Sequence, residues 1–183
     1  LEPLARHSPG LTGFDWGSYL RLSVIRMVRA HAAMRALGAE SGRLLDVGAY
    51  FGNFAVMFAR SGFQVDAVDS YREYGSALAG AAHLLRAEGV QVLDCADLGA
   101  GFPGLRDGTY DVVTCMGVLE HVPHTPRPLL ELLDRVLRPG GLLVLDTPTL
   151  AYAYSRERFA RGESVFGPIE LQYDTQIPFE GHH

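Results

Sequence analysis

The sequence predicts an α/β fold, a doubly wound and mainly parallel sheet with helices on both faces. Five short apolar runs rich in Val and Leu recur along the chain, as expected of strands buried on both faces. Helical patterns separate these runs, and strands that alternate with helices imply parallel crossover units. The composition agrees, since 48% of the 183 residues are hydrophobic and 20% are charged. These values are typical of one globular domain.

The first expected element is a helix that begins at Ser18 and is stopped by Gly38. Residues 1–17 before it are rich in Pro and Gly, and they predict an irregular arm anchored by Phe14 and Trp16. We assign residues 1–38 to an arm and helix that cover a ligand site. The apolar stripe of this helix is predicted at Leu20, Val24, Met27, Val28, His31 and Met34.

The strands are expected at residues 43–47, 63–69, 90–94, 110–116 and 141–147, with helices at about 53–60, 72–88 and 127–138. In the last of these helices Pro128 suits the first turn, and the run RPGG that begins at Arg138 ends it. Together these elements define a core of residues 39–150. A short helix is expected within residues 151–163, followed by a loop.

Charge and cysteine content narrow the class of partner. The net charge of −5 comes without a run of like charges, so nucleic acid is a poor candidate partner. Cys95 and Cys115 have neither metal-pair nor redox-pair spacing, which favours a reducing, cytoplasmic location. No stretch approaches the roughly 20 apolar residues of a membrane span, and no leader pattern is seen. We therefore expect no membrane partner.

The stretch LLDVGAYFGNFA, residues 44–55, runs from a strand through a glycine-spaced turn into a helix. In open α/β sheets, ligands lie beyond the carboxyl ends of the strands. Gly48 permits a sharp turn against a ligand, and Gly52 opens a helix whose free amides favour an anionic or polar group. A dinucleotide fingerprint needs glycine where Tyr50 stands. No Lys-Ser/Thr follows Gly52, which excludes a P-loop.

The turn resembles motif I of the class I S-adenosylmethionine-dependent methyltransferases, Asp-x-Gly-x-x-x-Gly, met here by Asp46, Gly48 and Gly52. Further family landmarks follow in order: VDAVDS at the second strand, VLDCADL after the third, YDVVTCMGVLEHVPHTP at the fourth and RVLRPGGLLVLDTP at the fifth. The resemblance covers roughly residues 40–150 and is nearest to small-molecule enzymes such as the ubiquinone-biosynthesis O-methyltransferases. It implies a Rossmann-like methyltransferase sheet and S-adenosylmethionine as cofactor.

The adenosine half of that cofactor has its own candidate residues. Asp69 lies 23 residues beyond Asp46 and closes the second strand, where its carboxylate, with Ser70 beside it, can accept both ribose hydroxyl protons. By resemblance, Asp94 or Asp97 would accept from the adenine amine, and the Cys95 amide would meet a ring nitrogen.

The methionine half is assigned in the same way. The resemblance places Met116 and Gly117 along the methionine arm, with Asp46 holding the amino group directly or through water. An aromatic ring can favour the charge of a sulfonium through its face. We expect this shield from Tyr50, Phe51 or Trp16.

Methyl transfer is an in-line displacement at carbon, in which positioning supplies much of the acceleration. A base is needed only when the acceptor is a hydroxyl or a protonated amine. The candidates for catalysis are His121 and His124, just past the fourth strand, with Glu120 beside them. The alternative for His121 is structural, because many family members carry a similar EHV whose histidine holds the loop.

A divalent metal is a secondary prediction. Some relatives bind one through Glu-x-x-Glu-His and a later histidine. Glu120 and His121 match the second half of that motif, Gly117 stands in place of its first glutamate, and His182 or His183 would complete the set. Without the first carboxylate such a site would be weak.

The sequence thus predicts methyl transfer from S-adenosylmethionine to a small-molecule acceptor, an oxygen in the first instance. Three alternatives stay open: a nicotinamide-dependent oxidoreductase, a non-catalytic binding or regulatory subunit, and a metal-assisted RNA 2′-O-methyltransferase. The family sheet closes with two further C-terminal strands, for which the 36 residues after Thr147 leave too little room. Residues 151–183 are expected to be an incomplete acceptor-side segment, or a homodimer partner would complete the sheet edge.

Overall fold

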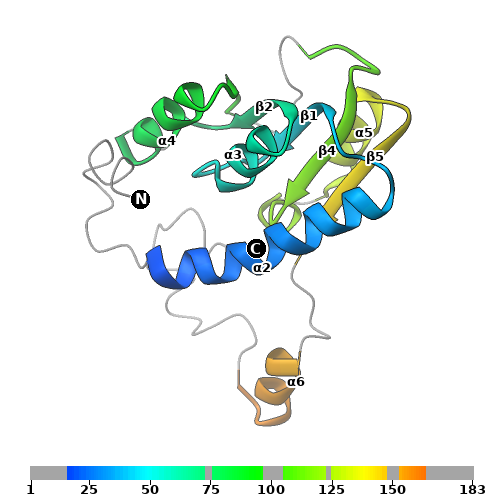
Figure 1. The fold of residues 1–183 in the computed structure, drawn as a ribbon. Helices are drawn as coiled ribbons and strands as arrows, with labels where there is room; N and C mark the ends of the chain where they lie inside the picture. The colour runs from blue at the N-terminus through cyan, green and yellow to red at the C-terminus, as the bar shows by residue number, and fades with distance from the viewer. Residues whose placement is uncertain (1–15, 73–75, 97–104, 123–124, 148–152, 164–183) are drawn as a thin grey trace.

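The computed structural model describes residues 16–72, 76–96, 105–122, 125–147 and 153–163 (Figure 1). Its elements, in chain order, are α2 (Trp16–Ala36), β1 (Gly42–Val47), α3 (Asn53–Arg60), β2 (Phe63–Asp69), α4 (Ser76–Ala87), β3 (Gln91–Asp94), β4 (Tyr110–Met116), the 3-10 helix η2 (Leu119–His121), α5 (Arg127–Val136), β5 (Leu137–Asp146) and α6 (Ala153–Ala160).

The five strands form one parallel sheet in the order β3-β2-β1-β4-β5. The order reverses beside β1, because β2 and β4 both pair with it. The carboxyl ends of parallel strands lie at one edge, and that edge beside the reversal is where ligands bind in open α/β sheets. The α/β doubly wound prediction is confirmed.

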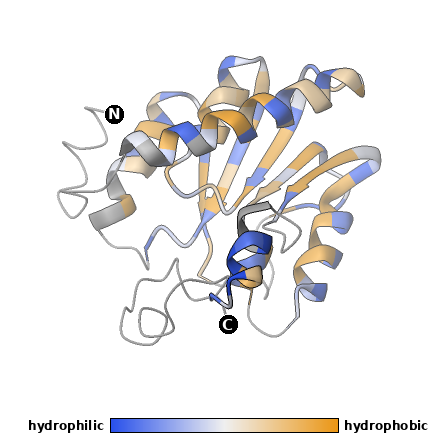
Figure 2. Ribbon diagram, turned by 90° about the horizontal axis from the view of Figure 1, so that it is seen from below, coloured by the Kyte–Doolittle hydropathy of each residue, from blue (hydrophilic) through white to orange (hydrophobic). Residues whose placement is uncertain are grey.

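Two apolar cores cover the two faces of the sheet. Leu44 on β1 faces the core built with α2, α3 and α4, whereas its neighbour Leu45 faces the core built with α5. This alternation follows from the period of two along a strand. Figure 2 shows the strands as largely apolar between their covering helices. The strand pattern of the sequence was therefore a sound guide to burial for β1, β2 and β4, whereas β3, at one edge of the sheet, is only partly buried, contrary to prediction.

The apolar stripe predicted for the first helix is partly wrong. Val24 and Val28 are 50% and 61% exposed, whereas Ser23, Ala30 and Met34 are buried. The buried stripe is thus rotated by about one residue from the predicted one. The reason is that α2 contacts α3 and β5 at the ligand edge, where part of its partner surface is polar. The prediction for Met34 is confirmed.

The start and the burial of the fifth strand also differ from prediction. α5 ends at Val136, and the RPGG run lies inside β5 as an irregularity of register opposite Tyr110 and Val112. Leu143 and Leu145 are 38% and 36% exposed, because within the described residues β5 pairs only with β4. The strand is therefore not buried on both faces. Among the described residues no helix is long and apolar enough to cross a membrane.

Candidate active site

Acidic residues gather at the carboxyl edge of the sheet. Asp46 lies next to the last residue of β1, while Asp69 and Asp94 end β2 and β3. Asp46 and Asp69 are only 2% and 6% exposed, and Asp94 is exposed. The negative charge of Asp69 contributes to the raised pKa of Asp46, so the two carboxyl groups disfavour each other's ionisation. A buried pair of carboxylates is expected to attract a cationic ligand group.

Asp46 is the most unusual of these residues. Its Oδ1 accepts a hydrogen bond from the Thr114 hydroxyl at 2.7 Å, whereas its Oδ2 is buried and has no partner in the described structure. Burial raises the pKa of Asp46 from 3.8 to about 7, and the Thr114 hydroxyl and the nearby Ala55 amide lower it only in part. An unpaired buried carboxylate oxygen is costly, so its position at a ligand edge indicates a missing partner.

Asp69 holds the glycine turn from the neighbouring strand. Its Oδ2 accepts from the Tyr50 amide and its Oδ1 from the Ser70 amide, both at 2.7 Å. Tyr50 has a φ of 49°, the left-handed region that favours glycine. Burial raises the pKa of Asp69, and these amide bonds oppose that shift. Tyr50 therefore has a strained backbone at the position where a dinucleotide fingerprint has glycine, and the hydrogen bond to Asp69 holds it in this conformation.

Glycine is required at positions 48 and 52 for two reasons, namely the backbone conformation and the lack of space for a Cβ. Each has a positive φ, and a Cβ placed on Gly48 would lie 2.3 Å from Cγ2 of Val118. A Cβ on Gly52 would lie 2.3 Å from Cδ2 of Leu85. The turn is thus packed against the loop after β4 on one side and α4 on the other. The assignment of both residues to a close turn at the ligand edge is consistent with this packing.

α2 brings an aromatic side chain to the same turn, which the sequence analysis missed. The Tyr19 ring packs edge-on against Tyr50 at 6.0 Å and Phe51 at 5.4 Å between ring centroids, and its hydroxyl donates to Asn53 at 2.8 Å. Burial raises the pKa of Tyr19 to about 12, so the hydroxyl stays protonated. The spacing of Tyr19, Ser23 and Arg26 on the helix was the available signal.

Arg26 is the second contribution of α2 that the sequence analysis missed. Its guanidinium donates from Nε and Nη2 to the two carboxylate oxygens of Asp146 at the end of β5, each at 2.6 Å. A Cβ placed on Gly117 would lie 2.7 Å from Nη2 of Arg26 and 3.3 Å from Oε1 of Glu120. Arg26 therefore occupies the space that a side chain at position 117 would need.

Tyr71 adds a further polar atom at this edge. Its hydroxyl is buried two residues beyond Asp69 and has no hydrogen-bond partner among the described residues. Burial raises the pKa of Tyr71, and the charges of Asp69 and Asp46 raise it further. No spacing in the sequence distinguished this residue from an ordinary core tyrosine.

The residues predicted to bind adenine already form hydrogen bonds within the protein. Asp94 accepts from the Arg72 amide at 3.0 Å and pairs with the Arg72 guanidinium at 2.7 Å. The Cys95 amide donates to the Asp69 carbonyl at 2.9 Å, which argues against its predicted bond to a ring nitrogen. Both cysteine side chains are buried. Asp97 lies outside the described residues.

The catalytic candidates lie just beyond β4. Glu120 and His121 are in η2; the Thr147 hydroxyl donates to Glu120 at 3.4 Å, and the His121 side chain is exposed. Met116 ends β4, and the Gly117 amide donates to the Asp146 carbonyl at 3.1 Å. The rest of the predicted set, His124, His182, His183 and the Trp16 side chain, falls outside the described part of the chain.

The surroundings of Gly117 argue against the predicted metal site. Within the described ranges no three His, Cys, Asp or Glu side chains are placed to hold a metal ion. The Arg26 guanidinium lies against Gly117 and near Glu120, and a fixed cation there opposes a divalent cation. The residues present do not fit a metal held by Glu120 and His121, and the part assigned to His182 stays untested.

Comparison with known proteins decides the family. The sequence profile of the family described as "Methyltransferase domain" matches residues 21–173. The chain belongs to this family. This methyltransferase domain is 37% identical over 131 residues to a ubiquinone biosynthesis O-methyltransferase of Xanthomonas euvesicatoria, covering 69% of this chain and 51% of the relative. The corresponding protein of Xanthomonas oryzae is 34% identical over 128 residues, with the same coverage. The domain spans about half the length of these relatives.

Solved structures agree on the fold. A protein of Pyrococcus horikoshii superposes with a TM-score of 0.61 at 21% identity, covering 86% of this chain and 68% of that one. Phosphoethanolamine N-methyltransferase 2 of Haemonchus contortus, solved with S-adenosylhomocysteine, has a TM-score of 0.54 at 22% identity and covers 74% and 33%. The [4+2]-cyclase SpnF superposes with a TM-score of 0.54 at 26% identity and covers 65% and 43%. The fold of this methyltransferase domain is therefore shared by proteins named for different reactions.

Proposed function

We propose that this domain binds S-adenosylmethionine at the carboxyl edge of its sheet and transfers the methyl group to the hydroxyl of a small molecule. The observation that best supports this proposal is that Oδ2 of Asp46 is buried and has no hydrogen-bond partner in the described structure. That cofactor supplies an electrophilic methyl group on a sulfonium and carries an ammonium group. A carboxylate with one free oxygen and a raised pKa suits an ammonium partner, which would restore its ordinary ionisation.

The remaining cofactor contacts follow from the same edge. Asp69, already anchored to two amides, keeps lone pairs for ribose hydroxyls, with Ser70 beside it. The rings of Tyr50 and Phe51 lie against each other at 3.8 Å between centroids, tilted by 47°, beside the turn, and can shield a cation. The adenine contacts assigned to Asp94 and Cys95 are the least supported, because Arg72 and Asp69 already hold these groups.

The same observations disfavour a nicotinamide dinucleotide. A dinucleotide places its pyrophosphate on the amides that open the first helix. At the start of α3 the Ala55 amide instead stabilises the Asp46 carboxylate, as its lowering effect on that pKa indicates. A buried carboxylate at that position repels a pyrophosphate. The non-catalytic subunit remains the alternative, because a shared fold does not by itself establish an activity.

The acceptor is proposed to enter over η2, with His121 or His124 as the base that takes the hydroxyl proton. Of these, His121 lies in the described chain, exposed and next to Glu120. The place of Arg26 against Gly117 favours a reaction without a metal, and therefore disfavours the metal-assisted RNA methyltransferase. A cytoplasmic location and a homodimer stay predictions.

The deciding experiment is calorimetric titration with S-adenosylmethionine, S-adenosylhomocysteine and NAD, each with and without a chelator. We expect micromolar binding of the two sulfur compounds, no binding of NAD and no effect of the chelator. Asp46→Asn should weaken binding at least tenfold, while the exposed control Asp134→Asn on α5 should not change it. Binding of NAD alone, or an unchanged affinity of Asp46→Asn, would contradict the proposal.

Methyl transfer is tested separately with a panel of small hydroxylated acceptors. His121→Ala should slow turnover at least tenfold and leave cofactor affinity unchanged, as expected of a base that does not touch the cofactor. Cofactor binding without turnover on any acceptor in the panel would favour the non-catalytic alternative.

A further inference from the structure

A second polar pocket lies at the opposite, amino edge of the sheet. It has a volume of about 230 Å³ and is lined by Arg43, Asp66, Gln91, Leu93, Leu105, Arg106, Thr109 and Tyr110. Arg43 is the second residue of β1, and Gln91 and Tyr110 are the first residues of β3 and β4. The proposed cofactor residues lie at the other ends of these same strands, so the pocket is a separate site.

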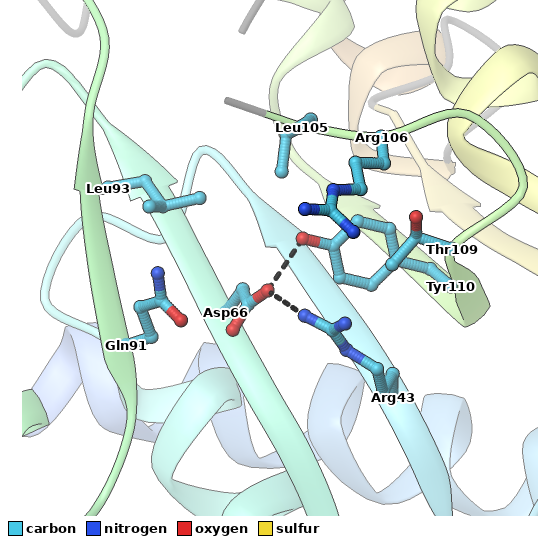
Figure 3. A pocket seen from close by; sticks show the side chains of 8 residues that line it. All are labelled: Arg43, Asp66, Gln91, Leu93, Leu105, Arg106, Thr109 and Tyr110. Atoms are coloured by element: carbon cyan, nitrogen blue, oxygen red, sulfur yellow. Dashed lines mark hydrogen bonds and ion pairs between the residues drawn. The ribbon is translucent and has the colours of Figure 1, made fainter. Parts of the chain in front are cut away.

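The floor of the pocket is a network of hydrogen-bonded polar side chains. Oδ2 of Asp66 accepts from the Tyr110 hydroxyl at 2.6 Å and from Nη2 of Arg43 at 3.0 Å (Figure 3). Asp66 and Tyr110 are 8% and 1% exposed, and the Arg43 guanidinium also lies over the Tyr110 ring at 5.4 Å. Burial raises the pKa of Tyr110, as does its bond to Asp66, so the hydroxyl remains a donor.

The charges of the pocket do not balance. Two guanidinium groups face one carboxylate, which leaves a formal excess of one positive charge. Asp66 is shared by Arg43 and Tyr110, whereas Arg106 has no hydrogen bond or ion pair with any residue that the structure describes. Figure 3 shows the Arg106 and Arg43 guanidinium groups on either side of the Asp66 and Tyr110 pair. The pocket therefore has more guanidinium N–H donors than its single carboxylate, whose Oδ2 already accepts two bonds, can receive.

The lining also indicates the kind of ligand. Guanidinium groups bind planar carboxylates through two parallel bonds. Leu93 and Leu105 provide an apolar wall, and the volume is below the roughly 300 Å³ at which pockets begin to hold drug-sized ligands. We infer that this pocket binds a small organic monocarboxylate, whose carboxylate pairs with Arg106 and the free N–H groups of Arg43 while its apolar body contacts Leu93 and Leu105.

Benzoate is a suitable probe, with benzamide as its neutral analogue and inorganic phosphate as a smaller anion without an apolar body. In calorimetric titrations of the chain, we expect benzoate to bind and the other two to bind at least tenfold more weakly. Arg106→Gln should weaken benzoate binding at least tenfold. Arg127→Gln, at an exposed position that begins α5, is the matched control and should leave it unchanged.

Two further results would overturn the inference. Benzamide binding as well as benzoate would show that the charge of the ligand is not recognised. Displacement of benzoate by S-adenosylhomocysteine would place it at the carboxyl edge instead. Because Arg106 is exposed, its substitution should not impair folding, and an equal melting temperature of the two variants checks this point. If the chain fails to bind S-adenosylhomocysteine, the benzoate titration still tests this pocket by itself.

Discussion

The ionisation of Asp46 should be visible in how stability depends on pH. Its pKa is about 7 in the folded chain and 3.8 when unperturbed. A pKa unit corresponds to about 1.4 kcal/mol, so a shift of about three units corresponds to about 4 kcal/mol as an upper estimate. The folded chain binds this proton more tightly than the unfolded chain does. The contribution of this protonation to the free energy of unfolding is therefore complete below about pH 4 and is lost as the pH rises to about 7.

Asp46→Asn removes this titration while keeping an oxygen that accepts from Thr114. Urea denaturation at several pH values from 4 to 8 gives the free energy of unfolding of this variant and of the wild type. We expect the difference between the two to shift in favour of the variant by up to about 4 kcal/mol between pH 4 and pH 8. Asp134→Asn, at an exposed position on α5, is the control and should follow the wild type at every pH.

The same residue links stability to ligand binding. An ammonium group requires the ionised carboxylate, so S-adenosylhomocysteine should bind the wild type about tenfold more weakly for each pH unit below 7. The affinity of Asp46→Asn should be low and nearly constant over this range. If the substitution leaves the pH dependence of stability unchanged, Asp46 does not titrate as its burial indicates, and the reasoning from its unpaired oxygen fails.

Three other substitutions test the packing around the site. Gly48→Ala should destabilise the chain by at least about 2 kcal/mol in urea denaturation, because its Cβ meets Val118 and its φ is 70°, and Val118→Ala should restore part of the loss. Arg26→Ala should cost about 1 kcal/mol and speed amide exchange in α2, and Arg26→Lys should not rescue it fully, because an ammonium group cannot form the two parallel bonds that the planar guanidinium makes to Asp146. Phe58→Ala should cost about 3 to 5 kcal/mol, since this ring is fully buried in the core under α3. A decrease of less than about 1 kcal/mol in the free energy of unfolding for Phe58→Ala would contradict these assignments. So would a wild-type stability for Arg26→Lys.

The strands were predictable because their apolar runs report burial directly. The first four match the predicted limits to within one residue, and the turn between β1 and α3 was readable from its glycines. The start of β5 was missed, because Pro139 and the two glycines after it are typical of a turn, yet they lie in an irregular part of the strand. Such a departure is set by the pairing with β4, which local sequence does not encode.

The candidate site could be predicted only where its residues belong to a local sequence motif. Asp46 and Gly48 belong to a contiguous motif, so their positions followed from its spacing. Arg26 and Tyr19 contact partners far along the chain. They were missed because the predicted apolar stripe of α2 was rotated by about one residue from the buried one. The raised pKa of Asp46 also depends on burial by surrounding elements, which no spacing reports.

The bond between Arg26 and Asp146 joins residues 120 positions apart. Proteins are synthesised from the N-terminus at about 5 to 20 residues per second, so α2 leaves the ribosome about 6 to 24 seconds before its anchor on β5 exists. Its Ala30 and Met34, which are buried in the folded domain, are then not yet fully covered. The contact between α2 and β5 at the ligand edge can therefore form only after β5 has been synthesised, and until then the Arg26 guanidinium lacks the carboxylate that it binds in the folded domain.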